Sequence, residues 1–458
     1  MPVAAGACSI LLPMGFVVFL IYLMLIYMRP IEMFAPQLME LRPMVILWVI
    51  AFGSGLVSSF KHKEEFAARK RHMWVLCGFV FCIFVSKLMG SGFGEAIDAL
   101  SQFSSTALLY VLVSMYVNTL PRLRAACYVI MFSIFVLSVA AIASYETGYM
   151  LEQLVYRQPV SMDSVVAAKD LPPIPADDHS GAFMYRVHSV GFFDDPNDFA
   201  QMIVSLLPWL VWLYKPGKWF RNIFVVGIPL AVFGTTIFLT HSRGSLLGVG
   251  AMLFFGVRKA LGPVRTMMLI GVMAGGAAAS GFLGGRSLST KEESAEGRIE
   301  AWVEGFNMLR SSPLFGVGYL NFTNFNWLTA HNAFVLCFAE LGVIGFFFWI
   351  ASIVLAFQAA NQVAENAPEG SDIRQMGVLM RGSLVGFMTC SWFLSRTYQP
   401  TLYVLLALCV ASWHIATRSQ EASKVEAVTR DAPWVFTTIK MMMIAMSAVQ
   451  AFIFVNRH

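Results

Sequence analysis

The sequence predicts an all-α protein that crosses a membrane many times. Hydrophobic residues make up 57% of the 458 residues and charged residues only 13%, whereas a soluble domain carries roughly 25% charged residues. The mean hydropathy is +0.67. A hydrocarbon layer needs roughly 20 apolar residues per helix, and the chain contains many runs of about this length. The formal net charge of +5 requires no nucleic-acid partner, because basic residues in short cytoplasmic loops account for it.

Apolar runs along the chain predict 12 or 13 membrane-spanning helices. The run 245–257 is short and the run 434–455 follows a charged tail, so the count is left between these two numbers. The N-terminus lacks the basic start of a cleavable signal peptide, so we expect the first run to remain as a helix. The runs lie near 10–27, 44–59, 73–89, 103–119, 125–144, 199–214, 222–239, 245–257, 264–283, 332–357, 379–394, 400–416 and 434–455.

The distribution of lysine and arginine orients these helices. If the helices alternate in direction, the basic clusters at 61–71, 122–124, 215–221 and 258–265 all fall on one side. Short loops rich in basic residues favour the cytoplasm, so we expect this side, and the N-terminus, to be cytoplasmic.

Two long polar loops then lie on the opposite side of a single membrane domain that covers 1–458. The first loop, 145–198, contains a proline-rich stretch that predicts irregular backbone. The second, 284–331, contains apolar residues at helical spacing, which predict an amphipathic helix at the interface or over a cavity. These apolar residues are Ile299, Trp302, Val303, Phe306 and Leu309.

Charged and polar residues crowd at the end of the first loop, in Tyr185–Ala200. Pro196 disfavours helix for the residue before it, and Asn197 or Asp198 is expected to cap the helix that follows. The segment therefore predicts a polar turn that leads into a membrane helix. Its polar residues are Arg186, His188, Asp194, Asp195, Asn197 and Asp198.

Two further polar features are expected on the same face. Arg243, in the stretch His241-Ser-Arg-Gly244, lies between two apolar runs, and a charge at that depth is costly and usually functional. Its planar guanidinium can hold phosphate oxygens with two parallel hydrogen bonds. His331, followed by Asn332, begins a long apolar run, where a neutral imidazole can accept a proton. Two arginines and one histidine on one rim suit a pyrophosphate leaving group and a hydroxyl nucleophile.

Five motifs in order resemble those of the O-antigen ligase and O-antigen polymerase superfamily. They are Arg186…Gly191-Phe-Phe-Asp-Asp-Pro-Asn-Asp198, His241-Ser-Arg-Gly244, Gly297-Arg298…Trp302, Pro313-Leu-Phe-Gly-Val-Gly318 and Ala330-His-Asn332. The motifs occupy about 185–350, and the arrangement of apolar runs extends the resemblance over most of the chain.

The resemblance implies a GT-C-like bacterial inner-membrane glycosyltransferase that works at the periplasmic face. Its donor would be a glycan on undecaprenyl pyrophosphate, its acceptor a glycan or a lipid A core sugar, and its mechanism inverting, with no metal or other cofactor. Carried onto this sequence, Arg186 and Arg243 would bind the pyrophosphate, and His331 would be the general base. Arg298 would contact pyrophosphate or glycan. We place Asn332, Asp195, Asn197, Asp198 and His241 around the substrate.

Each of these residues also has a structural interpretation. Arg186 can extend its side chain to the interface, and His331 can cap a helix. The aspartates can bind a divalent cation, or they can shape the turn and pair with arginine, which we favour. We interpret Gly316 and Gly318 as turn residues, because no phosphate-binding lysine follows. Six of the seven cysteines lie in apolar runs without metal-ligand spacing, so we expect buried thiols.

Alternative functions follow from the same residues. If the acceptor is a second lipid-linked repeat unit, the protein is a polymerase of O-antigen or exopolysaccharide. If the acceptor is a lipid A core sugar, it is a ligase, and if the acceptor is a protein hydroxyl, it is an O-oligosaccharyltransferase. From another class, a transporter or flippase for a lipid-linked sugar predicts ionisable groups at the bilayer midplane and symmetry between the two halves. Here the polar residues gather on one face and no internal repeat is evident.

Overall fold

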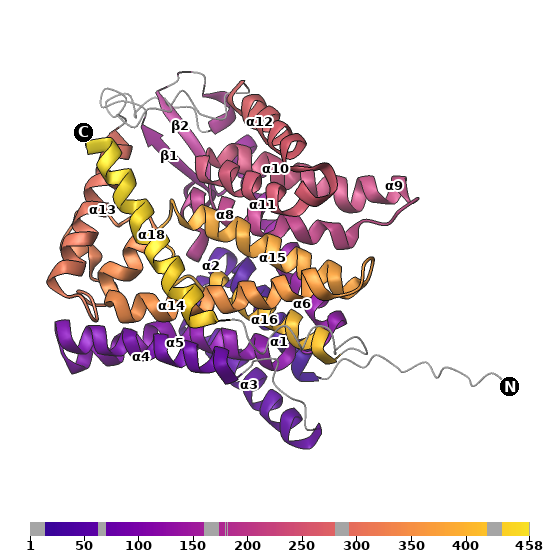
Figure 1. The fold of residues 1–458 in the computed structure, drawn as a ribbon. Coiled ribbons are helices and arrows are strands. Elements are labelled where there is room, and N and C mark those ends of the chain that lie inside the picture. Colours follow the sequence, from indigo (N-terminus) through magenta and orange to yellow (C-terminus); the bar gives the residue numbers. More distant parts are fainter. Residues whose placement is uncertain are drawn as a thin grey trace.

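A computed structural model describes residues 14–62, 70–159, 174–178, 180, 182–279, 293–418 and 433–457. These residues form helices and one two-stranded antiparallel sheet (Figure 1), which confirms the all-α class. Before the sheet come α1 Met14–Met28, α2 Pro30–Phe34, η1 Pro36–Leu41, α3 Pro43–His62, α4 Lys70–Ser91, α5 Phe93–Tyr116, α6 Leu120–Thr147 and α7 Leu151–Leu154. The sheet pairs β1 Val155–Pro159 with β2 Phe183–Val187, and η3 Pro175–Asp177 lies between them.

The second half of the chain is again helical. It contains η4 Gly191–Phe193, α8 Pro196–Leu206, η5 Leu207–Leu213, α9 Trp219–Asn222, η6 Ile223–Gly227, α10 Ile228–Thr240, α11 Arg243–Leu261, α12 Pro263–Ala279, α13 Glu293–Ser311, η7 Phe322–Asn324, α14 Ala333–Asn366, α15 Asp372–Ser391, α16 Pro400–Arg418 and α18 Trp434–Arg457.

Among the residues that the structure describes, seven helical stretches are long and apolar enough to cross a membrane, which confirms a polytopic membrane protein. They are Lys70–Ser91, Phe93–Tyr116, Leu120–Thr147, Trp219–Thr240, Ala333–Asn366, Pro400–Arg418 and Trp434–Asn456. Shorter apolar helices occupy Met14–Met28, Pro43–Val57 and Arg243–Gly256. These ten stretches overlap ten of the predicted runs, among them 434–455. The total of 12 or 13 membrane crossings remains a prediction.

The predicted run 199–214 does not form one continuous α-helix. It is divided into the 11-residue α8 and the 3₁₀ segment η5, whose second residue is Pro208. Proline has no amide hydrogen for the α-helical bond and its ring clashes with the preceding turn. The backbone therefore tightens at this position.

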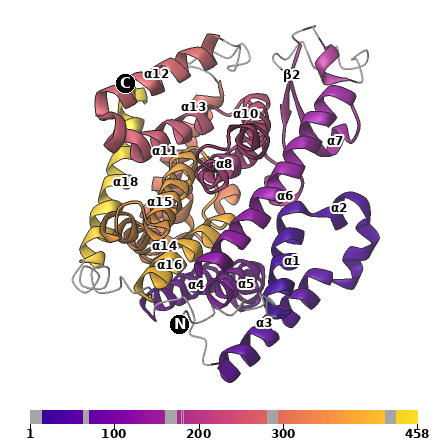
Figure 2. The same ribbon diagram turned by 90° about the vertical axis from the view of Figure 1, so that its right-hand side faces the viewer.

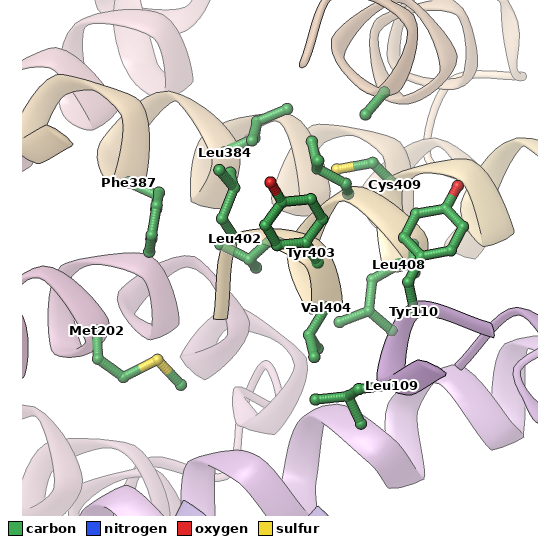
Figure 3. Close-up of a cluster of buried hydrophobic side chains, with 14 of the residues drawn as sticks. Leu109, Tyr110, Met202, Leu384, Phe387, Leu402, Tyr403, Val404, Leu408 and Cys409 are labelled. Carbon is green, nitrogen blue, oxygen red and sulfur yellow. The ribbon is translucent and has the colours of Figure 1, made fainter. Parts of the chain in front are cut away.

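The centre of the bundle is formed by α14 and α16. In their most apolar windows, 72% of α14 and 89% of α16 is buried, compared with 22% for α18. The helix α14 contacts α4, α13, α15, α16 and α18, and Figure 2 shows α14, α15 and α16 surrounded by the other helices. Figure 3 shows the apolar side chains of α16, such as Leu402, Leu408 and Cys409, among residues of α5, α8 and α15.

The cysteines largely follow the prediction. Five of them, at 82, 127, 337, 390 and 409, are buried free thiols. Cys77 is exposed on α4, so the expectation of a buried thiol is wrong for this residue. Cys8 lies outside the described residues.

Candidate functional site

The polar segment that begins at Tyr185 starts in a strand and not in a loop. Arg186 belongs to β2 and pairs with Tyr156 of β1. The sequence prediction missed this sheet because its strands are five residues long and separated by a proline-rich connection. The sheet fixes the backbone of Arg186, whose side chain is only 7% exposed.

The turn after β2 is capped by a residue other than the predicted ones. Asp195 is the N-cap of α8, and its side chain accepts a hydrogen bond of 2.7 Å from the backbone N–H of Asn197. Pro196 occupies the first helical position, where its fixed φ suits the helix and its missing N–H costs nothing. The expectation that Asn197 or Asp198 caps the helix is therefore wrong. Both side chains are available for contacts with other segments.

Arg186 connects this turn to the corner between α10 and α11. Its Nε donates to the carbonyl of Thr240 at 2.8 Å, and its Nη2 donates to Oδ1 of Asn197 at 2.9 Å. Thr240 is the last residue of α10, His241 follows with a left-handed φ of 49°, and Arg243 begins α11. The corner with His241 and Arg243 therefore lies beside the turn that carries Asn197.

Asp198 forms an ion pair with Arg396, a residue that the sequence prediction missed. The Nε of Arg396 donates to Oδ1 of Asp198 at 2.6 Å, and its Nη2 faces the second carboxylate oxygen. Burial raises the pKa of Asp198 to about 7, while the facing guanidinium opposes this rise. The signal was present in the sequence: Arg396 lies in a short connection on the face expected to be poor in basic residues.

His331 lies at a sharp corner just before α14. Its φ is 47°, in the left-handed region. The residue before it, Ala330, accepts a hydrogen bond of 2.8 Å from Nε1 of Trp302 on α13. The residue after it, Asn332, caps α14 by accepting from the N–H groups of Phe334 and Val335. These contacts fix the backbone on both sides of the imidazole.

The electrostatic surroundings of His331 keep the imidazole neutral at pH 7. Burial lowers its pKa to about 4, with Arg298 and Arg396 acting in the same direction and Asp195 acting against them. The same interactions place His331 near Arg298 on α13, near the Asp195 turn and near the connection that carries Arg396.

The segments that carry the predicted site residues thus form one linked group, which His241 and Arg243 join through the backbone of neighbouring Thr240. Arg186 contacts Asn197 and the end of α10, the Asp195 turn lies near His331, and His331 lies near Arg298. Asn332 is fully buried and its side-chain oxygen caps α14, so it supports the His331 corner. We call the segments 186–198, 240–243, 298–302, 329–332 and 395–398 the site cluster.

The remaining acidic and histidine residues of the turn have structural contacts. Nδ1 of His188 lies 3.1 Å from the carbonyl oxygen of Ser189 and 3.5 Å from Oδ1 of Asp194. Asp195 caps a helix and Asp198 pairs with Arg396, so the capping and arginine-pairing roles are found, but on the opposite aspartates from those expected. Within the described ranges, no group of three or more His, Cys, Asp or Glu residues is arranged to hold a metal ion.

A cavity of about 260 Å³ adjoins the site cluster at Phe192. Its walls are mostly apolar and come from α1, α2, η1, α3, α5 and the start of α16, with Arg29 and Glu32 among the lining residues. Arg29 forms an ion pair of 2.6 Å with Glu32, and its guanidinium lies 4.9 Å from the centre of the Phe192 ring. None of the nine predicted site residues lines this cavity.

The apolar helices make this a polytopic membrane protein. Its polar site contains arginine and histidine residues and is formed by loops from distant parts of the chain. Residues 228–350 match the family model described as O-antigen ligase, which confirms the resemblance to the O-antigen ligase superfamily. The match runs from α10 into α14 and contains His241, Arg243, Arg298, His331 and Asn332. It supports glycan transfer of the ligase or polymerase type in general. No curated protein matches the chain.

Proposed function

We propose that the protein transfers a glycan from undecaprenyl pyrophosphate to an acceptor hydroxyl at the periplasmic face of the bacterial inner membrane, as an O-antigen ligase or polymerase. One observation carries this proposal: segments near 186, 243, 298, 331 and 396, far apart in the sequence, lie in one linked group. The group includes Arg186 and Asn197, which lie outside the segment matched by the family model.

The reaction assigned to this group is a single displacement at the anomeric carbon. The acceptor oxygen forms the new bond to that carbon while the bond to the pyrophosphate oxygen breaks, and the leaving pyrophosphate keeps the electron pair. Attack from the opposite side inverts the anomeric centre. The proton of the acceptor hydroxyl passes to the neutral imidazole of His331, which acts as general base.

Charge that develops on the leaving group is stabilised by guanidinium groups. Arg186 and Arg243 are assigned to the pyrophosphate because guanidinium groups bind phosphate oxygens with paired, charge-assisted hydrogen bonds. Fixed donors of this kind stabilise the transition state without having to reorganise during the reaction. Arg298 is assigned to pyrophosphate or glycan, and Arg396 holds Asp198 beneath the turn.

The test is a deletion strain whose envelope glycans are separated on a gel. Loss of the modal ladder with single core-linked units retained identifies a polymerase, whereas lipid-linked polymer accumulating beside bare core identifies a ligase. Loss of glycan from a protein alone identifies an O-oligosaccharyltransferase. Unchanged glycans contradict the proposal.

Purified protein in lipid nanodiscs separates transfer from transport. With the lipid-linked glycan extracted from the deletion strain and its acceptor, a transferase produces glycosylated acceptor and free undecaprenyl pyrophosphate. A transporter or flippase of the lipid-linked sugar leaves the donor intact.

A further inference from the structure

Glu340 on α14 is a buried carboxylate outside the assigned chemistry. Its side chain is 1% exposed, and each of its two oxygens accepts a hydrogen bond from a different segment. Oε1 accepts from the backbone N–H of Phe322 at 3.0 Å, and Oε2 accepts from the hydroxyl of Tyr398 at 2.8 Å. A buried carboxylate is costly unless its oxygens are satisfied, so this arrangement is a specific one.

The first segment bound by Glu340 leads to His331. Phe322 begins the turn η7, nine residues before His331 in the chain. The residue before it, Asn321, accepts a hydrogen bond of 2.8 Å from Nζ of Lys87 on α4. Two helices, α4 and α14, therefore hold the start of the connection that carries His331.

The Pro313–Gly318 motif fixes the same connection to a break in α14. Gly342 has a non-helical φ of 65° inside this helix. Amide groups freed by the break are satisfied across the two segments: Val317 and Gly318 donate to the carbonyls of Ala339 and Glu340 at 3.0 Å, and Val343 donates to Pro313 at 2.8 Å. A Cβ on Gly316 or Gly342 would collide with the opposing backbone. The glycines of this motif therefore serve close backbone packing.

The second segment bound by Glu340 carries Arg396. Tyr398 is two residues from Arg396, and Thr397 between them donates from Oγ1 to the carbonyl of Ala333 at 2.7 Å. A further hydrogen bond joins the two connections: Oγ1 of Thr329, before α14, donates to Oγ of Ser395, after α15, at 2.6 Å. The segments that carry His331 and Arg396 are thus joined by three sets of contacts, and of these three only the one through Glu340 involves a carboxylate.

We propose that Glu340 is a positioning residue for the transfer reaction, holding the segments that carry His331 and Arg396 at a fixed separation through its two hydrogen bonds. This inference rests on the proposed function. The role depends on the reach of the side chain: glutamine at 340 can keep both contacts, because the Tyr398 hydroxyl can rotate and accept from the amide. Aspartate keeps the charge but is shorter by one methylene and cannot reach both partners.

The experiment compares Glu340→Gln, Glu340→Asp and Tyr398→Phe with the matched control Glu365→Gln. Glu365 lies on the same helix and forms an ion pair of 2.7 Å with Arg381, in which the Glu365 side chain is partly exposed, away from the site cluster. Each variant is purified in nanodiscs, and kcat and donor KM are measured with the lipid-linked glycan extracted from the deletion strain. Values are expressed per folded protein.

We expect Glu340→Asp to lower kcat about 10- to 100-fold with little change in donor KM, because a displacement of about 1 Å in a catalytic group costs this much. Glu340→Gln should lose about threefold, less than the full cost of such a displacement. Tyr398→Phe removes one of the two contacts of Glu340 and should lower kcat about as far as Glu340→Asp. Glu365→Gln should keep wild-type kcat. The proposal is overturned if Glu340→Asp keeps full kcat, or if Glu340→Gln loses more than Glu340→Asp, since charge and not reach would then matter.

Hydrogen exchange keeps the inference separate from the proposed function. Glu340→Asp should raise the exchange rates of backbone amides in 319–332 and in 395–398, and Glu365→Gln should leave both unchanged. This readout needs no glycan transfer. If the wild-type protein transfers no glycan but Glu340→Asp still raises the exchange rates, only the proposed function is contradicted. If Glu340→Asp leaves the exchange rates unchanged, the positioning role is contradicted.

Discussion

The two ends of α14 hold charged residues in different ways. At one end, Glu340 contacts two connections from distant parts of the chain, and the backbone is irregular, with left-handed φ at Gly316, Leu320 and His331. Towards the other end, Arg381 on α15 donates to Glu365 and Asn361 on regular α14, with distances of 2.7 and 2.8 Å. The first end stores backbone strain where segments meet, which is typical of functional sites, and the second is an ordinary helix–helix contact.

The largest difference between the ends is expected for His331. His331→Ala should lower kcat by about 10²–10⁴-fold, the range that a general base contributes, and should leave donor binding nearly unchanged. The matched comparison is His188→Ala, whose ring contacts the Ser189 carbonyl, and we expect a smaller loss there. Equal kcat in His331→Ala and wild type would remove His331 as the base.

A second comparison uses two arginines of α11, Arg243 in the site cluster and Arg258 outside it. Arg243→Ala should weaken binding of undecaprenyl pyrophosphate about 10- to 100-fold, since a charge-assisted hydrogen bond contributes roughly 1.5–3 kcal/mol. Arg258 on the same helix, with its guanidinium 4.7 Å from the centre of the Phe255 ring, is the control, and Arg258→Ala should bind like wild type. Equal weakening in both variants would argue against a specific role for Arg243.

The ion pair between Asp198 and Arg396 should behave as a coupled unit. Arg396→Ala leaves a buried carboxylate without its partner, which costs roughly 3–5 kcal/mol for a fully buried pair. The Arg396 side chain is 38% exposed, so we expect about 1–3 kcal/mol after solvent screening. Asp198→Asn in the same chain should recover part of this loss in a denaturant-unfolding experiment. Additive losses in the double variant would show that the two residues are not coupled.

The acid side of the pH profile tests the surroundings of His331. Because the folded-state pKa is lowered to about 4, the imidazole stays neutral between its ordinary value of about 6.5 and pH 4. The acid limb of kcat/KM, which reports the free enzyme, should therefore lie near pH 4. In the unfolded chain the imidazole takes up a proton below about pH 6.5, so this group lowers stability as the pH falls through that range. Because the pKa of the neighbouring Asp198 is about 7, the profile is also measured in Asp198→Asn, and a limb near pH 6.5 that persists in this variant would contradict the buried environment of His331.

The helices and the polar motifs were predictable from the sequence for a simple reason. Apolar runs and the residues Arg186, Arg243 and His331 are local signals in the sequence. From the positions of these three residues between apolar runs, we expect them on one face of the membrane. The two-stranded sheet, the Asp195 cap and the partner of Asp198 depend on contacts between segments up to 198 residues apart. Glu340 lay inside an apolar run, where its hydrogen bonds to Phe322 and Tyr398 leave no local trace.

The smallest expected effect concerns divalent metal ions. Asp195 caps a helix and Asp198 pairs with Arg396, so both carboxylates already have contacts that metal binding would have to replace. If these contacts persist during turnover, the transfer rate should be the same with and without EDTA, measured in nanodiscs with the extracted lipid-linked glycan. Loss of activity in EDTA that is restored by one divalent metal would instead assign the aspartates to a cation.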